Sequence, residues 1–266
     1  MAGIMTAMGV LETSRGRIGI ERVGDGAATP LIFLHGVGSD KSVWRPQLEY
    51  FGKSRPCCAF DYPGYGESDF QPGATRDDFA ASVLAAMDAL DIGRAHVCGL
   101  SLGGIVAIAM HHAAPDRVAS LILADTFQVH PDGQAIFDRA ITASRSMPMG
   151  KLAEARAGKL LGPAATPEML AEVVATMSRI EPRAYALGAE AVWLADQRQR
   201  VSAINVPTLV LVGEEDQITP PALSESLLSA IGGAKMVVVK RAGHLPNLEQ
   251  AADFNEAISR HLTEVE

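Results

Sequence analysis

Ser101 is the residue of this chain best placed to act as a nucleophile. It lies in Gly99-Leu100-Ser101-Leu102-Gly103, between an apolar run at residues 95–98 and a segment of helical character at residues 102–114. A serine with glycines two positions to either side, between a strand and a helix, indicates the sharp turn called a nucleophile elbow. Its hydroxyl can attack a carbonyl carbon, provided that a base takes the proton and backbone donors stabilise the oxyanion.

His244 and Asp216 are the candidates for the base and for the acid that orients it. Each follows an apolar run, Asp216 after residues 208–212 and His244 after residues 236–239. An imidazole accepts and returns a proton near neutral pH, and a carboxylate holds the ring in the required tautomer. Three other carboxyl groups compete for the role of the acid: those of Glu214, Glu215 and Asp125, the last of which follows the run at residues 121–124.

The oxyanion site is expected from two backbone N–H groups. His35-Gly36-Val37-Gly38 follows the apolar run at residues 31–34, and its glycines allow backbone N–H groups to face a ligand. We expect the N–H groups of Val37 and Leu102 to form this site, assisted by the positive end of the helix that begins at Leu102. Loss of one such donor typically costs about 2.7 to 4 kcal/mol of transition-state stabilisation.

The apolar runs that precede these residues predict a mainly parallel sheet. They are rich in Val, Ile and Leu without polar alternation, as strands covered on both faces require, and helical segments separate them. The carboxyl ends of such strands are where open α/β sheets bind ligands. Residues 10–23 differ, because the turn Ser14-Arg15-Gly16 divides two alternating stretches and predicts an antiparallel hairpin at one edge. The predicted parallel strands are residues 31–34, 57–60, 95–98, 121–124, 208–212 and 236–239, and the predicted helices are residues 43–52, 76–90, 102–114, 222–231 and 247–262.

A helical insertion is predicted between two strands of this sheet. From residue 127 to residue 201 the strand pattern disappears, Ala, Met, Leu and Glu become frequent, and five prolines divide the stretch into short helices. We therefore expect a core domain at residues 1–126 and 202–266 and a helical cap at residues 127–201.

The order of these pieces resembles that of the α/β-hydrolase superfamily over about residues 10–262. The elbow, the His-Gly loop, Gly213-x-x-Asp216-x-x-Thr219-Pro220 and Gly243-His244 occur in the family's order. The resemblance implies a mostly parallel eight-stranded sheet flanked by helices, with an N-terminal antiparallel hairpin and an inserted helical cap. It also implies a triad of Ser101, His244 and Asp216 that cleaves carboxylic ester or lactone bonds through an acyl-enzyme, without a metal or an organic cofactor.

Within the superfamily, residues 89–104 and 117–124 are similar to the branch of carboxylesterases and 3-oxoadipate enol-lactonases. Those lactonases usually have Arg-Gly-His-Gly where this chain has Pro63-Gly64-Tyr65-Gly66. Hydrolases of carbon–carbon bonds and cofactor-free perhydrolases share the triad, and a ligand receptor of the same fold could keep it with little turnover. These functions remain alternatives, because a fold and a triad do not fix the reaction or its rate.

A cap over the serine would supply most of the substrate pocket. Met and Leu on its helices suit small, moderately hydrophobic esters or lactones, although such residues more often pack between a cap and a core. Arg139, Arg145 and Arg183 are alternative contacts, for a substrate carboxylate. The residues expected to line the pocket are His35, Gly36, Phe127, Met147, Leu161, Trp193 and Leu245.

Composition argues against several other classes of function. A net charge of −8 disfavours binding to nucleic acids or anionic membranes, and no apolar run approaches the roughly 18 residues of a membrane-spanning helix. Cys57, Cys58 and Cys98 lie in predicted strands and favour a reducing compartment, and residues 1–9 lack the features of a signal peptide, so we expect a cytoplasmic protein. The histidine spacings complete no metal site. We expect a small-molecule ester or lactone substrate, no metal or cofactor, and no nucleic-acid or membrane partner, and the sequence is compatible with a homodimer.

Overall fold

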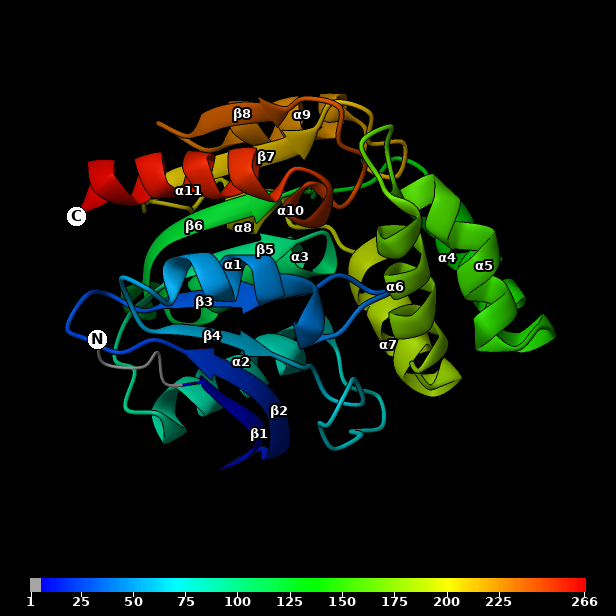
Figure 1. The fold of residues 1–266 in the computed structure, drawn as a ribbon, viewed down its shortest axis with the longest axis horizontal. Helices are drawn as coiled ribbons and strands as arrows, with labels where there is room; N and C mark the ends of the chain where they lie inside the picture. Colours follow the sequence, from blue (N-terminus) through cyan, green and yellow to red (C-terminus); the bar gives the residue numbers. More distant parts are fainter. Residues whose placement is uncertain (1–5) are drawn as a thin grey trace.

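The computed structural model describes residues 6–266, and the expectation for residues 1–9 falls mostly outside them. Eight strands form one sheet in the order β1-β2-β4-β3-β5-β6-β7-β8 (Figure 1). The β1–β2 and β2–β4 pairs are antiparallel and all others are parallel, so the predicted hairpin and parallel sheet are confirmed. The strands are β1 (Thr6–Thr13), β2 (Gly16–Val23), β3 (Leu31–Leu34), β4 (Cys57–Phe60), β5 (Ala95–Leu100), β6 (Val118–Ala124), β7 (Thr208–Gly213) and β8 (Lys235–Val239).

The sheet has a hydrophobic cluster on each face, because successive residues of a strand point in opposite directions. In β3, Ile32 and Leu34 belong to one cluster and Leu31 and Phe33 to the other. Helices on both sides complete these clusters, which is why the strands read as continuous apolar runs. The first face is covered by α2 (Arg76–Ala89), α3 (Leu102–Ala113) and α9 (Pro221–Ala230), and the second by α1 (Arg45–Phe51) and α11 (Ala251–Val265).

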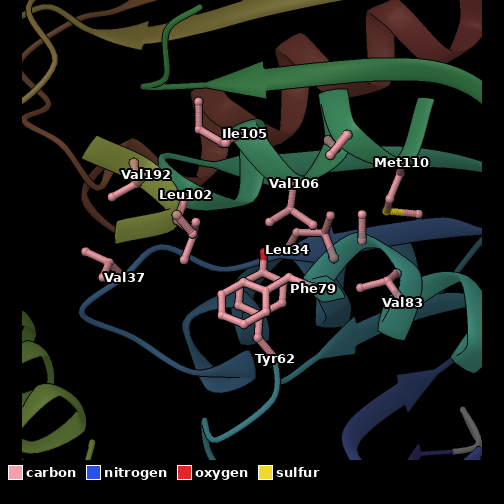
Figure 2. Close-up of a cluster of buried hydrophobic side chains, with 14 of the residues drawn as sticks. Leu34, Val37, Tyr62, Phe79, Val83, Leu102, Ile105, Val106, Met110 and Val192 are labelled. Atoms are coloured by element: carbon pink, nitrogen blue, oxygen red, sulfur yellow. The ribbon is translucent and has the colours of Figure 1, made fainter. Parts of the chain in front are cut away.

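The first cluster reaches the end of the sheet where the candidate site lies. Figure 2 shows Tyr62 stacked on Phe79, with Leu102 and Val37 at the same end of the cluster. The two ring centroids are 5.0 Å apart and the ring planes are nearly parallel, with an angle of 3° between them. The loop that follows β4 is therefore anchored in the core beside the loop that follows β3.

Four helices from the segment between β6 and β7 lie together beyond the carboxyl ends of the parallel strands (Figure 1). They are α4 (Gly133–Ser146), α5 (Met149–Leu160), α6 (Pro167–Ser178) and α7 (Pro182–Trp193). Proline is tolerated where α6 and α7 begin, because the first N–H groups of a helix have no partner within it. The short helix α8 (Arg198–Val201) packs on α3 and α9 instead. Among residues 6–266, no helix combines the length and the apolar character needed to cross a membrane.

The helix predicted at residues 247–262 is divided in two. The structure has α10 (Pro246–Glu249) and α11, with Gln250 between them at φ −135°. The break occurs where the Glu249 side chain turns back and accepts hydrogen bonds from the backbone of the preceding loop. A carboxylate is thereby placed beside the loop of His244.

Candidate active site

Ser101 occupies the turn between β5 and α3. Its φ of +55° and ψ of −114° are angles that non-glycine residues rarely adopt. The N–H of Ser101 donates to the carbonyl oxygen of Ala124 at 2.8 Å, which ties the turn to β6. A side chain at Gly99 would collide with the backbone of Gly103. The glycine spacing is therefore a steric requirement, and the turn has the geometry of a nucleophile elbow.

Asp216 and His244 are hydrogen-bonded to one another at the carboxyl ends of β7 and β8. His244 Nδ1 lies 2.8 Å from Asp216 Oδ2, and the Thr219 hydroxyl donates to the same oxygen at 2.6 Å. The N–H groups of Ile218 and Thr219 donate to Oδ1 at 2.7 and 3.1 Å. Burial acts to raise the pKa of Asp216, but the charge and hydrogen bond of His244, together with the Thr219 hydrogen bonds, lower it to about 2. The ionised carboxylate only accepts hydrogen bonds, so Nδ1 carries the proton and Nε2 is left as the basic atom.

Ser101 and His244 line the same cavity and are both almost fully buried, at 3% and 5% exposure. No hydrogen bond joins the Ser101 hydroxyl to His244 in the described part of the chain. Contacts between a nucleophile and its base are often long in a free enzyme and shorten when substrate binds. Ser101 and His244 thus line one cavity, Asp216 is joined to His244 by a hydrogen bond, and the serine–histidine hydrogen bond is not formed.

The peptide between Gly36 and Val37 lies against the serine. A Cβ atom at Gly36 would be 3.5 Å from the Cβ of Ser101, an ordinary van der Waals contact, so Gly36 lies directly beside the nucleophile. The carbonyl oxygen of Gly36 is 2.8 Å from Nδ1 of His35, which donates to it. Because the N–H and C=O of a trans peptide point in opposite directions, this contact directs the Val37 N–H away from His35. Leu102 is the first residue of α3, so its N–H also has no acceptor within the helix.

Asp125, the competing acid, is not hydrogen-bonded to His244. It is fully buried at the end of β6, and its Oδ1 accepts the N–H of Gly213 at 2.8 Å. Burial is the largest cause that raises the pKa of Asp125 well above its usual range, and the charge of Asp216 adds to this effect. Asp125 therefore carries a proton where Asp216 is ionised. Glu214 pairs with Lys240 at 2.6 Å on the surface, and Glu215 is exposed.

One oxygen of Asp125, one of Asp216 and one ring nitrogen of His244 lie within 4.8 Å of one another, a spacing that a metal ion could use. Both oxygens of Asp216 already accept protein donors, and Nδ1 of His244 is engaged with one of them. A protonated carboxyl such as that of Asp125 is a poor ligand, because metal binding requires deprotonated donors. The donor set therefore suits an acid–histidine pair better than an ion.

Glu249 is a residue of this site that the sequence motifs did not single out. Its carboxylate accepts the N–H groups of Gly243 at 2.9 Å and Leu245 at 3.4 Å, the two residues that flank His244. It also accepts the N–H of Gly162, just after α5, at 2.6 Å. Burial raises the pKa of Glu249, against the lowering effect of these three donors. Glu249 thus joins the histidine loop to the segment that follows α5. In the sequence, only its position five residues after His244 could have indicated this role.

The cavity beside Ser101 has a mostly apolar wall and encloses about 690 Å³, including its opening to solvent. Of the pocket residues predicted from sequence, Gly36, Trp193 and Leu245 lie on this wall. His35 and Phe127 do not line it; both are fully buried, and Phe127 stacks on Trp193. Met147 and Leu161 also lie outside the wall, Met147 being exposed at the end of α4.

Other side chains of the wall come from helices α5 and α6 and from the loops around the triad. Arg156 and Glu172 are the charged side chains of α5 and α6 on this wall, whereas Arg139, Arg145 and Arg183 lie outside it. Arg183 instead pairs with Glu181 on the surface. The lining residues that were not predicted as pocket residues are Val37, Gly38, Ser39, Ser42, Val43, Leu100, Ser101, Arg156, Leu160, Glu172, Val173, Thr176, Met177, Ile218, His244 and Leu248.

Comparison with known proteins identifies similar chains. A family model described as "Alpha/beta hydrolase family" matches residues 31–257. A 3-oxoadipate enol-lactonase from Acinetobacter baylyi is 30% identical over 234 residues, 86% of each chain. A pimeloyl-(acyl-carrier protein) methyl ester esterase from Neisseria meningitidis is 29% identical over 241 residues, 86% of this chain and 90% of the other. The crystal structure of an enol-lactonase from Burkholderia xenovorans LB400 superposes with a TM-score of 0.90 at 28% identity, covering 96% of this chain and all of that one.

Proposed function

This chain belongs to the alpha/beta hydrolase family, and on that premise we propose that it hydrolyses carboxylic ester or lactone bonds through an acyl-enzyme on Ser101. The observation that carries the proposal is the 2.8 Å contact of Asp216 with His244, which lines the cavity that also holds the strained serine. The relatives named as a lactonase and a methyl ester esterase support the same class of bond.

The reaction follows from the roles of the three side chains. Ser101 Oγ attacks the carbonyl carbon while His244 Nε2 takes its proton, and the negative charge on the carbonyl oxygen is stabilised by the N–H groups of Val37 and Leu102. Asp216 stabilises the imidazolium without taking its proton. When the tetrahedral intermediate collapses, His244 gives the proton to the leaving oxygen, which departs as an alcohol or, from a lactone, stays attached to the acyl chain. Water, activated by His244, then releases the acid and restores the serine.

The character of the cavity wall favours a small, largely uncharged substrate. Its wall is mainly apolar. Apart from the charged Arg156 and Glu172, its polar side chains are those of Ser39, Ser42, Ser101, Thr176 and His244. Arg156 makes no ion pair within the described residues, whereas Glu172 brings a negative charge to the same wall. We expect moderately hydrophobic acyl groups to bind best, and a distal carboxylate to be accepted only where Arg156 offsets Glu172.

The division into a core at residues 1–126 and 202–266 and a cap at residues 127–201 is part of this proposal. It is supported by the position of α4 to α7 beyond the strand ends and by the residues that α5, α6 and α7 contribute to the cavity wall (Figure 1). The last four residues of the segment form α8, which packs on the core helices α3 and α9.

The proposal is tested with p-nitrophenyl esters of graded acyl length and a panel of lactones, assayed with the natural chain and with Ser101→Ala. Turnover of at least one series, lost in the serine variant, is the expected result. Negligible turnover of every ester and lactone by folded protein would overturn it and favour a carbon–carbon hydrolase, a perhydrolase or a low-turnover receptor. Turnover retained in Ser101→Ala would remove the serine from the mechanism.

A further inference from the structure

Three consecutive carbonyl groups of the loop after β3 are each held by a buried side chain. The Tyr62 hydroxyl donates to the carbonyl oxygen of His35 at 3.2 Å, and the Tyr65 hydroxyl donates to that of Val37 at 3.2 Å. Between them, His35 Nδ1 donates to the carbonyl oxygen of Gly36 at 2.8 Å. The two tyrosines come from the loop after β4, which has no role in the mechanism above.

We propose that Tyr62 and Tyr65 are positioning residues for the oxyanion donor, and that their hydroxyls fix the peptides on either side of the one that carries the Val37 N–H. The inference rests on the proposed function, because it assumes that this N–H faces the developing oxyanion. A donor stabilises charge without reorganisation only if its peptide is held before the reaction begins. A hydrogen bond to each flanking carbonyl restrains the rotation that would otherwise turn the Gly36–Val37 peptide away from Ser101.

The buried surroundings of the two hydroxyls keep them protonated, so that both can donate hydrogen bonds. Tyr62 and Tyr65 are both fully buried, and burial raises the pKa of each phenol well above its usual range, so both retain their protons. The ring of His35 packs against both, with centroids 4.4 Å from Tyr62 and 5.1 Å from Tyr65. Burial is the largest influence on the pKa of His35 and lowers it, so this ring is neutral and donates through Nδ1. The three side chains pack against one another, and within residues 6–266 their hydrogen bonds to the backbone go to these three carbonyl oxygens.

Tyr65 also connects the oxyanion loop to α7. A Cβ atom at Gly188 of α7 would collide with the Tyr65 hydroxyl and would lie 2.9 Å from a methyl group of Val37. The helix can approach the loop this closely only because residue 188 has no side chain. Figure 2 shows Val37 and Leu102, the two expected donor residues, at the end of the cluster where Val192 of α7 also lies. A shift of α7 would therefore move the Tyr65 hydroxyl, and with it the peptide that follows Val37.

The test compares Tyr62→Phe and Tyr65→Phe with Tyr50→Phe, an exposed tyrosine of α1 that serves as the control. Phenylalanine keeps the ring packing and removes only the hydroxyl, so the variants should fold, and titration of the reactive serine corrects for any inactive fraction. Each variant is assayed for kcat and KM, and for inhibition by a trifluoromethyl ketone and by the secondary alcohol of the same shape. The ketone forms an oxyanion on the serine and the alcohol does not.

We expect Tyr62→Phe and Tyr65→Phe each to lower kcat by about 10-fold, less than the 10²- to 10³-fold that follows complete loss of one oxyanion donor. KM and alcohol affinity should stay within about 2-fold, and ketone affinity should fall in proportion to kcat/KM, as for an interaction made mainly in the transition state. The inference would be overturned if Tyr62→Phe and Tyr65→Phe had the same kcat as the Tyr50→Phe control. It would also be overturned if the two variants lost affinity for the ketone and for the alcohol to the same extent. If Ser101→Ala is inactive while both tyrosine variants keep full kcat, this inference alone fails; if Ser101→Ala is active, the proposed function fails first.

Discussion

The carboxyl groups of Asp125 and Asp216 lie at the ends of adjacent strands, with oxygens within 4.8 Å of one another, yet they differ in protonation. Asp216 accepts four hydrogen bonds, one of them from His244, and its pKa is about 2. Asp125 accepts one, from Gly213, and burial keeps it protonated. Two acidic groups whose surroundings drive their pKa values apart take different roles, and only the ionised one can support a histidine base.

The first prediction separates these two acids. Asp216→Asn should lower kcat by about 10³- to 10⁴-fold, because the amide no longer stabilises the imidazolium or its tautomer. Asp125→Asn should stay within about 3-fold of the natural chain, since an amide oxygen can still accept the Gly213 N–H. Steady-state kinetics on one ester decide the matter. The reverse ranking would assign the catalytic acid to Asp125.

The second prediction concerns stability and pH. The pKa of Asp125 is raised in the folded chain, whereas in the unfolded chain it has the usual aspartate value of about 3.9. At a pH between these two pKa values, the folded chain keeps a proton on Asp125 that the unfolded chain releases. The free energy of unfolding should therefore fall as pH rises in this window, by up to about 1.4 kcal/mol per pH unit from this group. Asp125→Asn removes that contribution.

Urea denaturation of the natural chain and of Asp125→Asn between pH 4.5 and 7.5 measures the difference. The advantage of the variant should grow with pH, whereas Asp138→Asn, at an exposed position of α4, should follow the natural chain. Parallel curves for Asp125→Asn and the natural chain would show that Asp125 is ionised in the folded state.

The sheet could be predicted, and the residues of the proposed triad located, because the signals are local. Strands covered on both faces appear as continuous apolar runs, and the residue that follows each run lies at the same edge of a parallel sheet, so Ser101, Asp216 and His244 could be expected near one another from position alone. The glycines at 99 and 103 have a steric cause that is also visible locally. These expectations did not require any knowledge of which distant segments contact one another.

The cavity wall could not be predicted in the same way, because it depends on how helices face one another. Leu160, the last residue of α5, lies on the wall, whereas Leu161 has already left the helix, with φ −106° and ψ 142°, and does not. Phe127 was expected in the pocket but stacks on Trp193, which takes the wall position. The hydrogen bonds of Glu249 and Tyr65 join segments far apart in the chain, and no spacing within the sequence encodes them.

The third prediction tests the link between Glu249 and the histidine loop. Glu249→Gln leaves one carbonyl oxygen for three N–H donors and turns an NH₂ group towards them, so some donors lose their acceptor. We expect a loss of about 1.5 to 3 kcal/mol in the free energy of unfolding, the range for hydrogen bonds to charged groups, and a lower kcat because His244 is held less firmly. Glu256→Gln, at an exposed position of α11, is the control. An unchanged kcat and unfolding midpoint for Glu249→Gln would contradict this role.

The fourth prediction concerns charge at the cavity wall. For each variant we compare kcat/KM on a neutral p-nitrophenyl ester with that on the monoester of a dicarboxylic acid of equal length. Arg156→Gln should lower the relative rate on the anionic ester by about 3- to 10-fold, and Glu172→Gln should raise it, because both side chains line the cavity with opposite charges. Arg145→Gln, outside the wall, should change nothing. Equal ratios in all four proteins would place the distal end of the substrate away from Arg156.

The central claim is that Ser101 is a nucleophile activated by the Asp216–His244 pair, and covalent labelling tests it most directly. The folded protein is treated with a fluorophosphonate, and the modified residue is identified by peptide mass spectrometry. The account predicts one adduct per chain on Ser101, no adduct in Ser101→Ala, and much slower labelling in His244→Ala. Absence of an adduct on the natural chain, or an adduct elsewhere that persists in Ser101→Ala, would contradict it.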